Sequence, residues 1–264
     1  MTLFGVGGRI SIVKSLIQQK FGEAAADYAA SPTHAAGPSL ARLVELIDTK
    51  PTWRLLDIAT GAGHTALAFA PQVAKVTASD ITPEMLAETR KLAKARKAGN
   101  VVTAQASADD LPFPDTSFNL VTCRLAAHHF PDPASFVREA ARVLIPGGLF
   151  ALVDNVSPDD AELAARYNAF EKLRDPSHGC CLGLDEWRGI IHDAGLTSTK
   201  SEIMDQDIAF DPWVARMRCT APTIARLKEM LQDGPLSVYL RPRDSAAGLV
   251  FTLREAILVA GKPI

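Results

Sequence analysis

Two aspartates and a glycine-rich turn form the clearest chemical signal in this chain. Residues 55–64 read Leu-Leu-Asp-Ile-Ala-Thr-Gly-Ala-Gly-His, which is a short apolar strand, a turn and the start of a helix. Gly61 and Gly63 have no Cβ, so the backbone of this turn can come close to a ligand. Asp80 ends the next apolar run, 23 positions after Asp57. This is near the roughly 20-residue interval that places an acid against the hydroxyls of a ribose, so the spacing predicts a nucleoside-containing cofactor.

Alternating strands and helices must position these groups. Apolar runs predict strands near 53–59, 74–80, 101–106, 118–124 and 148–154. Helical patterns lie near 63–71, 83–97 and 134–144. This alternation predicts an α/β fold with a Rossmann-like, doubly wound sheet that is mostly parallel and has helices on both faces. Ligands of such sheets bind outside the carboxyl ends of the strands, so one cleft should gather residues 60–64, 80–85, 105–109 and 124–130.

The pattern changes after residue 154. Helical patterns continue at 158–173, 185–194 and 211–232, the last with a break near Ala221 and Pro222. The apolar segments 203–210 and 249–260 are predicted to pair as an antiparallel edge. We therefore expect a single domain over 1–264, with an N-terminal helical cap (1–50), a cofactor-binding core (51–200) and a C-terminal sheet edge (201–264) that carries a helical insertion at 211–245.

Composition excludes several classes of partner. The net charge is −2 and no basic stripe is present, so we expect no nucleic-acid partner. No apolar run is long enough to span a bilayer, and the start of the chain lacks the pattern of a secretory signal. The 4 cysteines are irregularly spaced, which predicts reduced thiols in a cytoplasmic protein and no metal site. The role of Cys180 and Cys181 stays open, as does assembly into a homo-oligomer.

Five ordered blocks resemble the class I S-adenosylmethionine (SAM)-dependent methyltransferases, in particular the ubiquinone/menaquinone-biosynthesis-like small-molecule group. The blocks are Asp57-Ile-Ala-Thr-Gly-Ala-Gly63, 78–86, 108–121, His128-His129-Phe130 and Arg142-Val-Leu-Ile-Pro-Gly-Gly148. The resemblance covers about residues 21–200. It implies that the cofactor is SAM and that the protein is an enzyme. The expected reaction transfers a methyl group to a small, fairly apolar acceptor by in-line displacement.

The resemblance also implies which residues hold the cofactor. Asp80 would bind the ribose, Met85 would lie near the adenine, and Tyr28 would cover the methionine end. The expected cofactor-binding set is Tyr28, Asp57, Ala59, Thr60, Gly61, Gly63, Asp80, Ile81, Met85, Ser107, Ala108, Asp109 and Arg124. The sequence departs from the family at Ala59, where the first glycine of the motif stands, and at Ser107-Ala108, where an adenine-binding acid is common. Asp109 or backbone groups would then contact the adenine.

Two alternative functions fit parts of the same pattern. Residues 61–66 also fit the Gly-x-Gly-x-x-Ala fingerprint of an NAD(P)-dependent Rossmann oxidoreductase. Against this alternative, Asp57 stands where that fingerprint has an apolar residue, and no Tyr-x-x-x-Lys pair is present. The second alternative is a SAM-binding protein that carries out no transfer.

Two adjacent histidines follow the fourth predicted strand, at the mouth of the expected cleft. Histidine titrates near neutral pH, so it can take the proton of an acceptor that still carries one. We expect His129 to be this base or an orienting group. His128 is the second candidate, and a purely structural role is the alternative for both. Asp154 ends the fifth predicted strand at the same edge, and His178 lies in a polar loop that could reach the acceptor.

Overall fold

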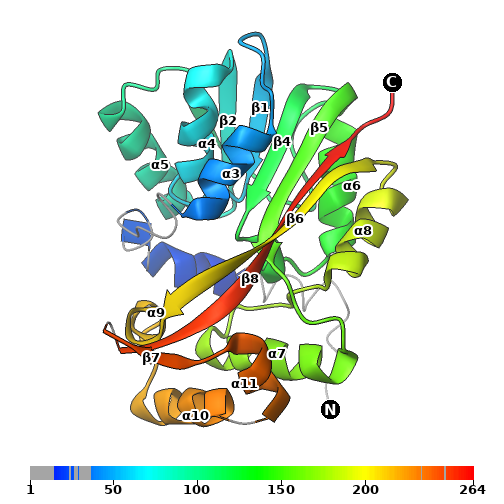
Figure 1. Cartoon of the computed structure of the whole chain (residues 1–264). Coiled ribbons are helices and arrows are strands. Elements are labelled where there is room, and N and C mark those ends of the chain that lie inside the picture. The colour runs from blue at the N-terminus through cyan, green and yellow to red at the C-terminus, as the bar shows by residue number, and fades with distance from the viewer. Residues whose placement is uncertain (1–14, 24, 27–28, 30–36, 233, 247) are drawn as a thin grey trace, which may run out of the picture.

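The computed structural model describes residues 15–23, 25–26, 29, 37–232, 234–246 and 248–264. Its strands are β1 (Arg54–Ile58), β2 (Lys75–Asp80), β3 (Val101–Gln105), β4 (Phe118–Arg124), β5 (Leu144–Asn155), β6 (Thr197–Ala209), β7 (Arg243–Ser245) and β8 (Gly248–Gly261). They form one sheet in the order β3-β2-β1-β4-β5-β8-β6, with β7 paired to β8 (Figure 1). The first five strands are parallel, and β8 runs antiparallel to both β5 and β6.

Helices cover both faces of this sheet (Figure 1). On one face, α3 (Pro38–Leu46) and α4 (His64–Phe69) bury Leu43 and Phe69 against the strands. On the other face, α6 (Pro133–Val143) and α8 (Leu184–Asp193) bury Phe136 and Trp187. The helix α5 (Pro83–Ala95) begins at a proline directly after Thr82 and packs against β2 and β3. The predicted mostly parallel, Rossmann-like sheet is therefore confirmed.

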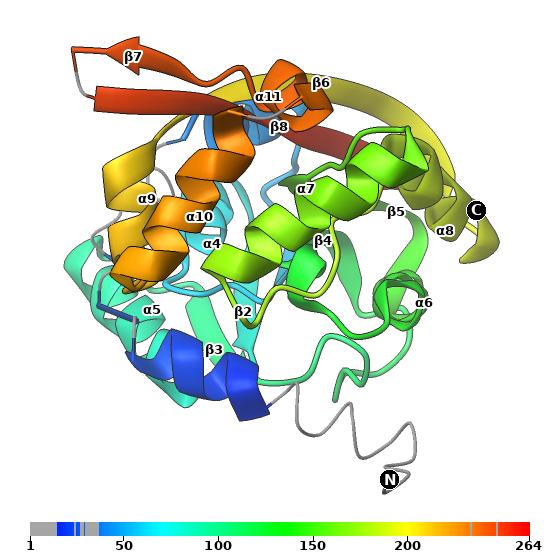
Figure 2. The same ribbon diagram turned by 90° about the horizontal axis from the view of Figure 1, so that it is seen from below.

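A third apolar cluster lies beyond the carboxyl ends of the parallel strands. It joins α7 (Ala161–Arg174), α9 (Phe210–Arg216), α10 (Ala221–Gln232) and α11 (Gly234–Leu240) to the outer half of β8. Seen from below, α7 and α10 lie side by side across this end of the molecule (Figure 2). Trp213 stacks on Phe170 with ring centroids 5.2 Å apart and meets Phe251 edge-on at 4.9 Å. No described helix is both long and apolar enough to cross a bilayer.

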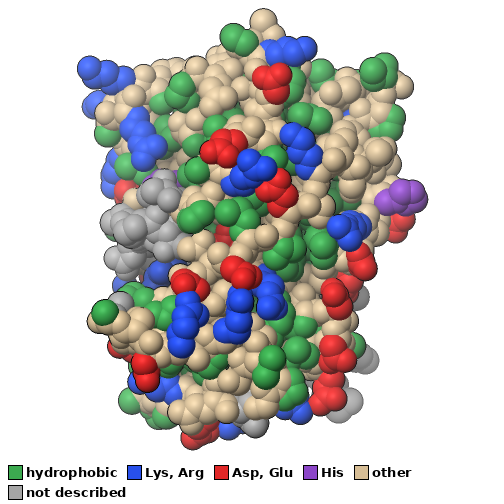
Figure 3. Space-filling model, in the orientation of Figure 1, with side chains coloured by type: hydrophobic (Ala, Val, Ile, Leu, Met, Phe, Trp, Pro, Cys, Tyr) green, Lys and Arg blue, Asp and Glu red, His purple; other side chains and the backbone are tan. Residues whose placement is uncertain are grey.

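The antiparallel edge predicted from 203–210 and 249–260 is also confirmed, and it is longer than expected. β6 pairs with β8 along its whole length and forms the outer edge of the sheet. Acidic and basic side chains alternate on this face (Figure 3). They include the ion pairs of Asp205 with Arg241 and of Asp207 with Arg243. Charges on an edge strand discourage unwanted pairing with another chain.

Two local predictions differ from the structure. The break expected at Ala221 and Pro222 lies earlier, because α9 ends at Arg216 and Ala221 already begins α10. Proline is tolerated in the first turn of a helix, where its missing N–H would have no partner, so Pro222 marks a start rather than a break. The strand β5 begins at Leu144 rather than near 148, since Leu144 pairs with Phe118 before Pro146 and the two glycines that follow it.

Candidate active site

A cleft opens at the carboxyl ends of β1, β2 and β4. Most of the expected cofactor-binding residues line it: Asp57, Ala59, Thr60, Gly61, Asp80, Ile81, Met85, Ser107, Ala108, Asp109 and Arg124. His129 lines it as well. Gly63 and His128 are not among the lining residues, and Tyr28 lies outside the described residues.

Asp57 is a buried anchor for the glycine-rich turn. One carboxylate oxygen accepts from the Thr60 hydroxyl at 2.6 Å and from the backbone N–H of Ala66 at 3.2 Å. The other accepts at 2.7 Å from Thr122, which stands beside Asp57 in the parallel register of β1 and β4. Burial raises the pKa of Asp57 to about 6, against the opposing effect of these hydrogen bonds. The carboxylate of Asp57 therefore orients the turn through its hydrogen bonds to Thr60, Ala66 and Thr122.

Replacing Asp57 with alanine is expected to destabilise the fold by about 3 kcal/mol, because three buried donors lose their acceptor. Urea unfolding measures this, with exposed Asp193→Ala as the matched control.

The contribution of Asp57 to stability should also depend on pH, with a definite sign. The folded-state pKa of Asp57 is raised to about 6 from 3.8, so the folded state binds the proton more tightly. Its contribution to stability should fall as pH rises from about 4 to 6, and Asp57→Asn should remove that slope. An unchanged slope in Asp57→Asn would contradict this.

Asp80 reaches across from the end of β2 to the same turn. One carboxylate oxygen accepts from the backbone N–H of Gly61 at 2.9 Å, and the other from that of Thr82 at 2.8 Å. Burial raises the pKa of Asp80, while these backbone donors act in the opposite direction. The Thr82 side chain and the backbone of Ile81 also act on this carboxylate as hydrogen-bond donors. Asp80 lines the cleft, so its carboxylate faces a ligand bound there.

The two glycines of the turn have different roles. Both adopt positive φ, +55° at Gly61 and +88° at Gly63, where a side chain is disfavoured. A Cβ on Gly63 would lie 2.7 Å from Cγ2 of Thr89, so this glycine permits α5 to pack against the turn. A Cβ on Gly61 would meet no atom of the described residues within 4 Å and would project from a cleft-lining position. The expected close approach of backbone to ligand therefore belongs to Gly61. Ala59 holds φ +50° without the freedom of glycine.

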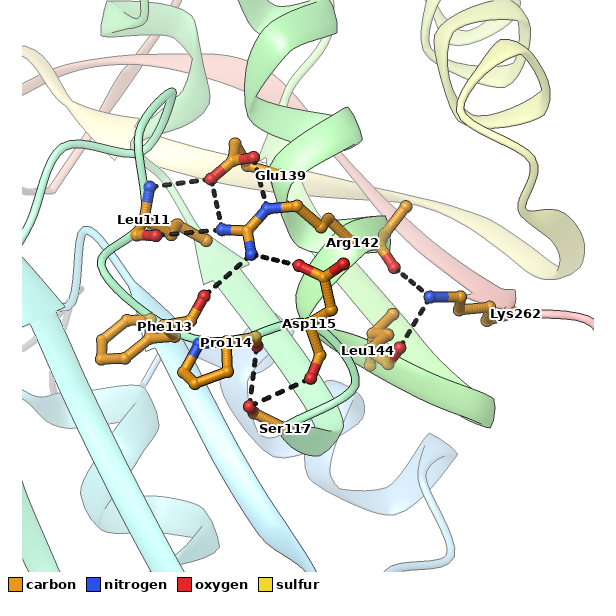
Figure 4. Close-up of polar contacts among 10 residues, drawn as sticks. Leu111, Phe113, Pro114, Asp115, Ser117, Glu139, Arg142, Leu144 and Lys262 are labelled. Atoms are coloured by element: carbon orange, nitrogen blue, oxygen red, sulfur yellow. Dashed lines mark hydrogen bonds and ion pairs between the residues drawn. The ribbon is translucent and has the colours of Figure 1, made fainter.

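The loop after β3 forms the far wall of the cleft, and a buttress of charged groups holds it in place (Figure 4). Arg142 of α6 donates to the carbonyls of Leu111 and Phe113 at 2.9 and 2.8 Å, and to Asp115 at 2.8 Å. Glu139 accepts from Arg142 and from the backbone N–H of Leu111, and this guanidinium lowers the pKa of Glu139. These contacts use all five N–H donors of the guanidinium. They fix the segment that directly follows the lining residues 106–109.

Several cleft residues were not predicted from the sequence. Ile17 and Phe21 lie on a helix over 15–23, and Gln18 of that helix donates to the carbonyl of Ile81 at 2.9 Å. Phe21 meets His129 edge-on, with ring centroids 4.9 Å apart. No motif marks these apolar residues. The sequence predicted only a helical cap over residues 1–50. It did not show which side chains of that cap face the cleft.

Arg124 ends β4 deep in the cleft. Its Nε donates to the Thr65 hydroxyl at 3.2 Å. Burial lowers the pKa of Arg124, although the carboxylates of Glu255 and Asp57 act against this. The group thus brings a positive charge to the wall of the cleft next to the turn, where it can meet a carboxylate.

His128, in the short helix η2 (Ala127–His129), is bound to Asp154 at two points. The carboxylate of Asp154 accepts from the backbone N–H of His128 at 2.7 Å and contacts the ring Nδ1 at 2.6 Å. Burial alone would lower the pKa of His128, but the charge of Asp154 and its hydrogen bond outweigh burial, so the pKa is raised. This is the arrangement that orients an imidazole and stabilises its protonated form.

His129 and His178 differ from His128 in their surroundings. Nδ1 of His129 lies 3.1 Å from the Ser177 carbonyl, and burial together with the charge of His128 lowers the pKa of His129 to about 4. Nε2 of His178 lies 2.9 Å from Oδ1 of Asn168, and burial lowers the pKa of His178 to about 3. The His128 ring lies 4.2 Å from that of His129 and 5.5 Å from that of His178. Within the described residues, no three His, Cys, Asp or Glu side chains are arranged to hold a metal ion.

Known proteins resemble this chain in both sequence and structure. Residues 56–152 match the methyltransferase domain family. The "uncharacterized methyltransferase YcgJ" of Bacillus subtilis is 39% identical over 196 residues, which are 74% of this chain and 78% of that protein. The crystal structure of YcgJ superposes with a TM-score of 0.81 at 33% identity, over 86% of this chain and 98% of that one.

More distant relatives agree with this match. A demethylmenaquinone methyltransferase of Chlorobaculum tepidum is 36% identical over 120 residues, which are 45% of this chain and 48% of that protein. Phosphoethanolamine N-methyltransferase 2 of Haemonchus contortus, solved in complex with SAM, shares the fold at a TM-score of 0.59 and 16% identity, over 88% of this chain and 54% of that one. With the fold and the cleft at the strand ends, these matches place the chain in the class I S-adenosylmethionine-dependent methyltransferases, in their ubiquinone/menaquinone-biosynthesis-like group.

Proposed function

We propose that the protein binds SAM in this cleft and transfers its methyl group to a small, fairly apolar acceptor by in-line displacement. The single observation that carries the proposal is Asp80, whose buried carboxylate lines the cleft and holds the backbone of Gly61 beside it. A ribose with two adjacent hydroxyls complements such a carboxylate. Membership in the methyltransferase family supports SAM over the dinucleotide alternative.

The cleft residues fit the parts of SAM. Asp80 would bind the ribose hydroxyls, and Ile81 and Met85 would pack against the adenine from α5 and the turn before it. On the opposite wall, Ser107, Ala108 and Asp109 offer polar and backbone groups to the base. Near β1 and β4, the glycine-rich turn at Thr60 would meet the amino group of the methionine end, and Arg124 would meet its carboxylate. When bound, SAM supplies a methyl carbon already activated by its sulfonium.

For the acceptor side, we propose His128 rather than His129 as the group that takes up a proton. Asp154 holds Nδ1 of His128 and leaves Nε2 directed away from β5, without a hydrogen bond among the described residues. The lowered pKa of His129 makes that ring a weak base, and its contacts with Phe21 and Ser177 suit a wall of the cofactor site. Asp154 would stabilise the imidazolium that forms on His128.

Calorimetry with SAM, S-adenosylhomocysteine (SAH) and NADH tests the cofactor. We expect SAM and SAH to bind and NADH not to bind. Transfer of labelled methyl from SAM to a panel of phenols, alcohols, amines and enols then tests the reaction. Failure of both SAM and SAH to bind would overturn the proposal. Tight SAM binding without product over the whole panel would favour the alternative of a SAM-binding protein that carries out no transfer.

The hydrogen bonds of Arg142 to Glu139, Asp115 and the loop after β3 should affect cofactor affinity, although Arg142 does not line the cleft. Arg142→Ala is expected to raise the Kd for SAH about tenfold, because the loop carrying residues 106–109 loses its fixed position. Arg142→Lys should recover only part of this, since an ammonium cannot donate along five fixed directions. Arg138→Ala, a change of an exposed arginine on the same helix, is the matched control. An unchanged Kd for SAH in Arg142→Ala would show that the loop holds its position without the buttress.

A further inference from the structure

His129 is a cleft-lining histidine that is held by the loop after α7. It lines the same cleft as Phe21, Asp57 and Arg124, and it is only 7% exposed. Its Nδ1 lies 3.1 Å from the backbone carbonyl oxygen of Ser177 and 3.4 Å from the hydroxyl oxygen of the same residue. The other ring nitrogen, Nε2, makes no hydrogen bond to a described residue. The protein therefore fixes one side of the ring and leaves a polar atom on the other.

The partners of Nδ1 determine which ring nitrogen carries the proton. A backbone carbonyl can only accept a hydrogen bond, so Nδ1 of His129 must donate to Ser177. The Ser177 hydroxyl gives its own hydrogen to Oδ1 of Asp175 at 2.6 Å, so towards Nδ1 it too is an acceptor. In a neutral imidazole one nitrogen donates and the other accepts. Nε2 of His129 therefore carries a lone pair.

Asp175 supports this arrangement from the side away from the cleft. Its Oδ1 also accepts from the backbone N–H of Ser177 at 2.8 Å, and its carbonyl accepts from that of His178 at 2.9 Å. Although burial acts to raise it, the pKa of Asp175 is lowered by the neighbouring His129 and by the hydrogen bonds from Ser177. Neither Asp175 nor Ser177 lines the cleft. Nδ1 thus faces away from the cleft, and Nε2, on the opposite side of the ring, faces into it.

His129 remains neutral near physiological pH. Burial and the charge of His128 lower the pKa of His129 to about 4, although Asp175 acts in the opposite direction. The ring of His128 lies only 4.2 Å from that of His129. At this position the cleft therefore presents the partial negative charge of a nitrogen lone pair.

We propose that Asp175 and Ser177 hold His129 in this tautomer, and that the lone pair on Nε2 selects the positively charged sulfonium of SAM over the neutral thioether of SAH. This inference rests on the proposed function and names the residue that distinguishes the two forms of its cofactor. An acceptor atom in a buried site attracts a positive charge more strongly than it would in water. The same contact would favour the exchange of spent SAH for SAM.

The proposed arrangement of SAM brings the sulfonium to this part of the cleft. Asp80 would hold the ribose and Arg124 the methionine carboxylate, and the sulfonium joins these two parts of the molecule. His129 lines the cleft together with both residues. Its ring also lies next to His128, the proposed base, towards which the methyl group must point for transfer.

Calorimetry with SAM and with SAH, on the full-length protein without an acceptor, tests the selection. His129→Phe keeps an aromatic ring against Phe21 and removes the lone pair. We expect the ratio of the SAH Kd to the SAM Kd to fall about tenfold in this variant, while the Kd for SAH itself stays within about threefold. His192→Phe, which changes an exposed histidine on α8, is the matched control and should leave the ratio unchanged.

The ¹⁵N signals of the His129 ring, assigned by their loss in His129→Phe, test the tautomer directly. At neutral pH we expect Nδ1 to be protonated and Nε2 to be unprotonated. Asp175→Ala should transfer part of the population to the other tautomer and should give an affinity ratio between those of the wild type and His129→Phe. Asp175→Asn keeps an acceptor oxygen for Ser177 and should restore most of both signals. The exposed Asp193→Ala is the control for loss of an aspartate.

The outcomes separate this inference from the proposed function. An affinity ratio unchanged in His129→Phe would overturn the selection by Nε2. An equal loss of affinity for SAM and SAH would also overturn it, because it would assign the contact to a group that both molecules share. A wild-type spectrum with the proton on Nε2 would overturn the tautomer. SAM binding would stand in all three cases, whereas failure of the wild type to bind both SAM and SAH would overturn the proposed function and this inference together.

Discussion

Asp80→Ala is expected to raise the Kd for SAH about 100-fold. Hydrogen bonds to a charged group contribute about 1.5–3 kcal/mol each, and the proposed ribose contact uses this carboxylate as its acceptor. The variant also leaves the backbone N–H groups of Gly61 and Thr82 without their acceptor, so the turn would lose part of its fixed geometry. Calorimetry with SAH measures the sum of both effects.

Adenosine separates the ribose contact from the rest of the cofactor. If Asp80 acts on the sugar, Asp80→Ala should weaken adenosine and SAH by the same factor. Asp80→Asn keeps one acceptor oxygen and should fall between the wild type and alanine. The exposed Asp193→Ala serves as the control for loss of an aspartate. Unchanged SAH affinity in Asp80→Ala would remove the basis of the proposed SAM site.

The sequence predicted the sheet well because its signals are local. The run that ends at Asp57 and the one that ends at Asp80 each carry a complete apolar strand, and parallel register then brings both ends to one edge. The antiparallel pairing of β6 with β8 followed from two apolar segments near the carboxyl end of the chain. The short β7 and the helix α11 carry too few residues for a periodic pattern, which is why the segment around 234–245 was predicted less well.

The polar interior of the site lay beyond sequence reasoning for a different reason. Thr122 and Glu171 become partners or neighbours of Asp57 and His128 only through tertiary contacts between distant segments. Asp154 was expected at this edge, but its bond to His128 was not predicted. Their residue types carry no motif. The need for tertiary contacts also explains why His129, rather than His128, was predicted from the sequence as the base. Two adjacent histidines are equivalent in a sequence, and only the fold shows that Asp154 holds His128 while His129 faces Phe21. The division of the chain into cap, core and edge regions stays a prediction.

His128→Asn is expected to lower kcat by 100-fold or more, as removal of a general base typically does, while the Kd for SAM changes little. His129→Asn is the matched variant, since the two residues are adjacent and both are largely buried. It should affect the Kd for SAM more than kcat, because His129 lines the proposed cofactor site. Turnover is measured as SAH release with an acceptor from the panel. The reverse pattern, a large loss of kcat in His129→Asn alone, would return the base to His129.

The pH profile distinguishes a base from a residue that merely supports the fold. The groups acting on His128 are Asp154 from β5, Glu171 from α7, Asp175 and His178 from the loop after α7, and the adjacent His129. Their net effect raises the pKa of His128 above its ordinary 6.5, with Asp154 acting against burial. A base works only when unprotonated, so kcat should rise with pH through a midpoint above 6.5. Asp154→Asn removes the charge that raises this pKa, so the midpoint should move to lower pH while the maximal rate falls because the ring loses its orientation. A midpoint that stays in place in Asp154→Asn would show that the titrating group is not His128.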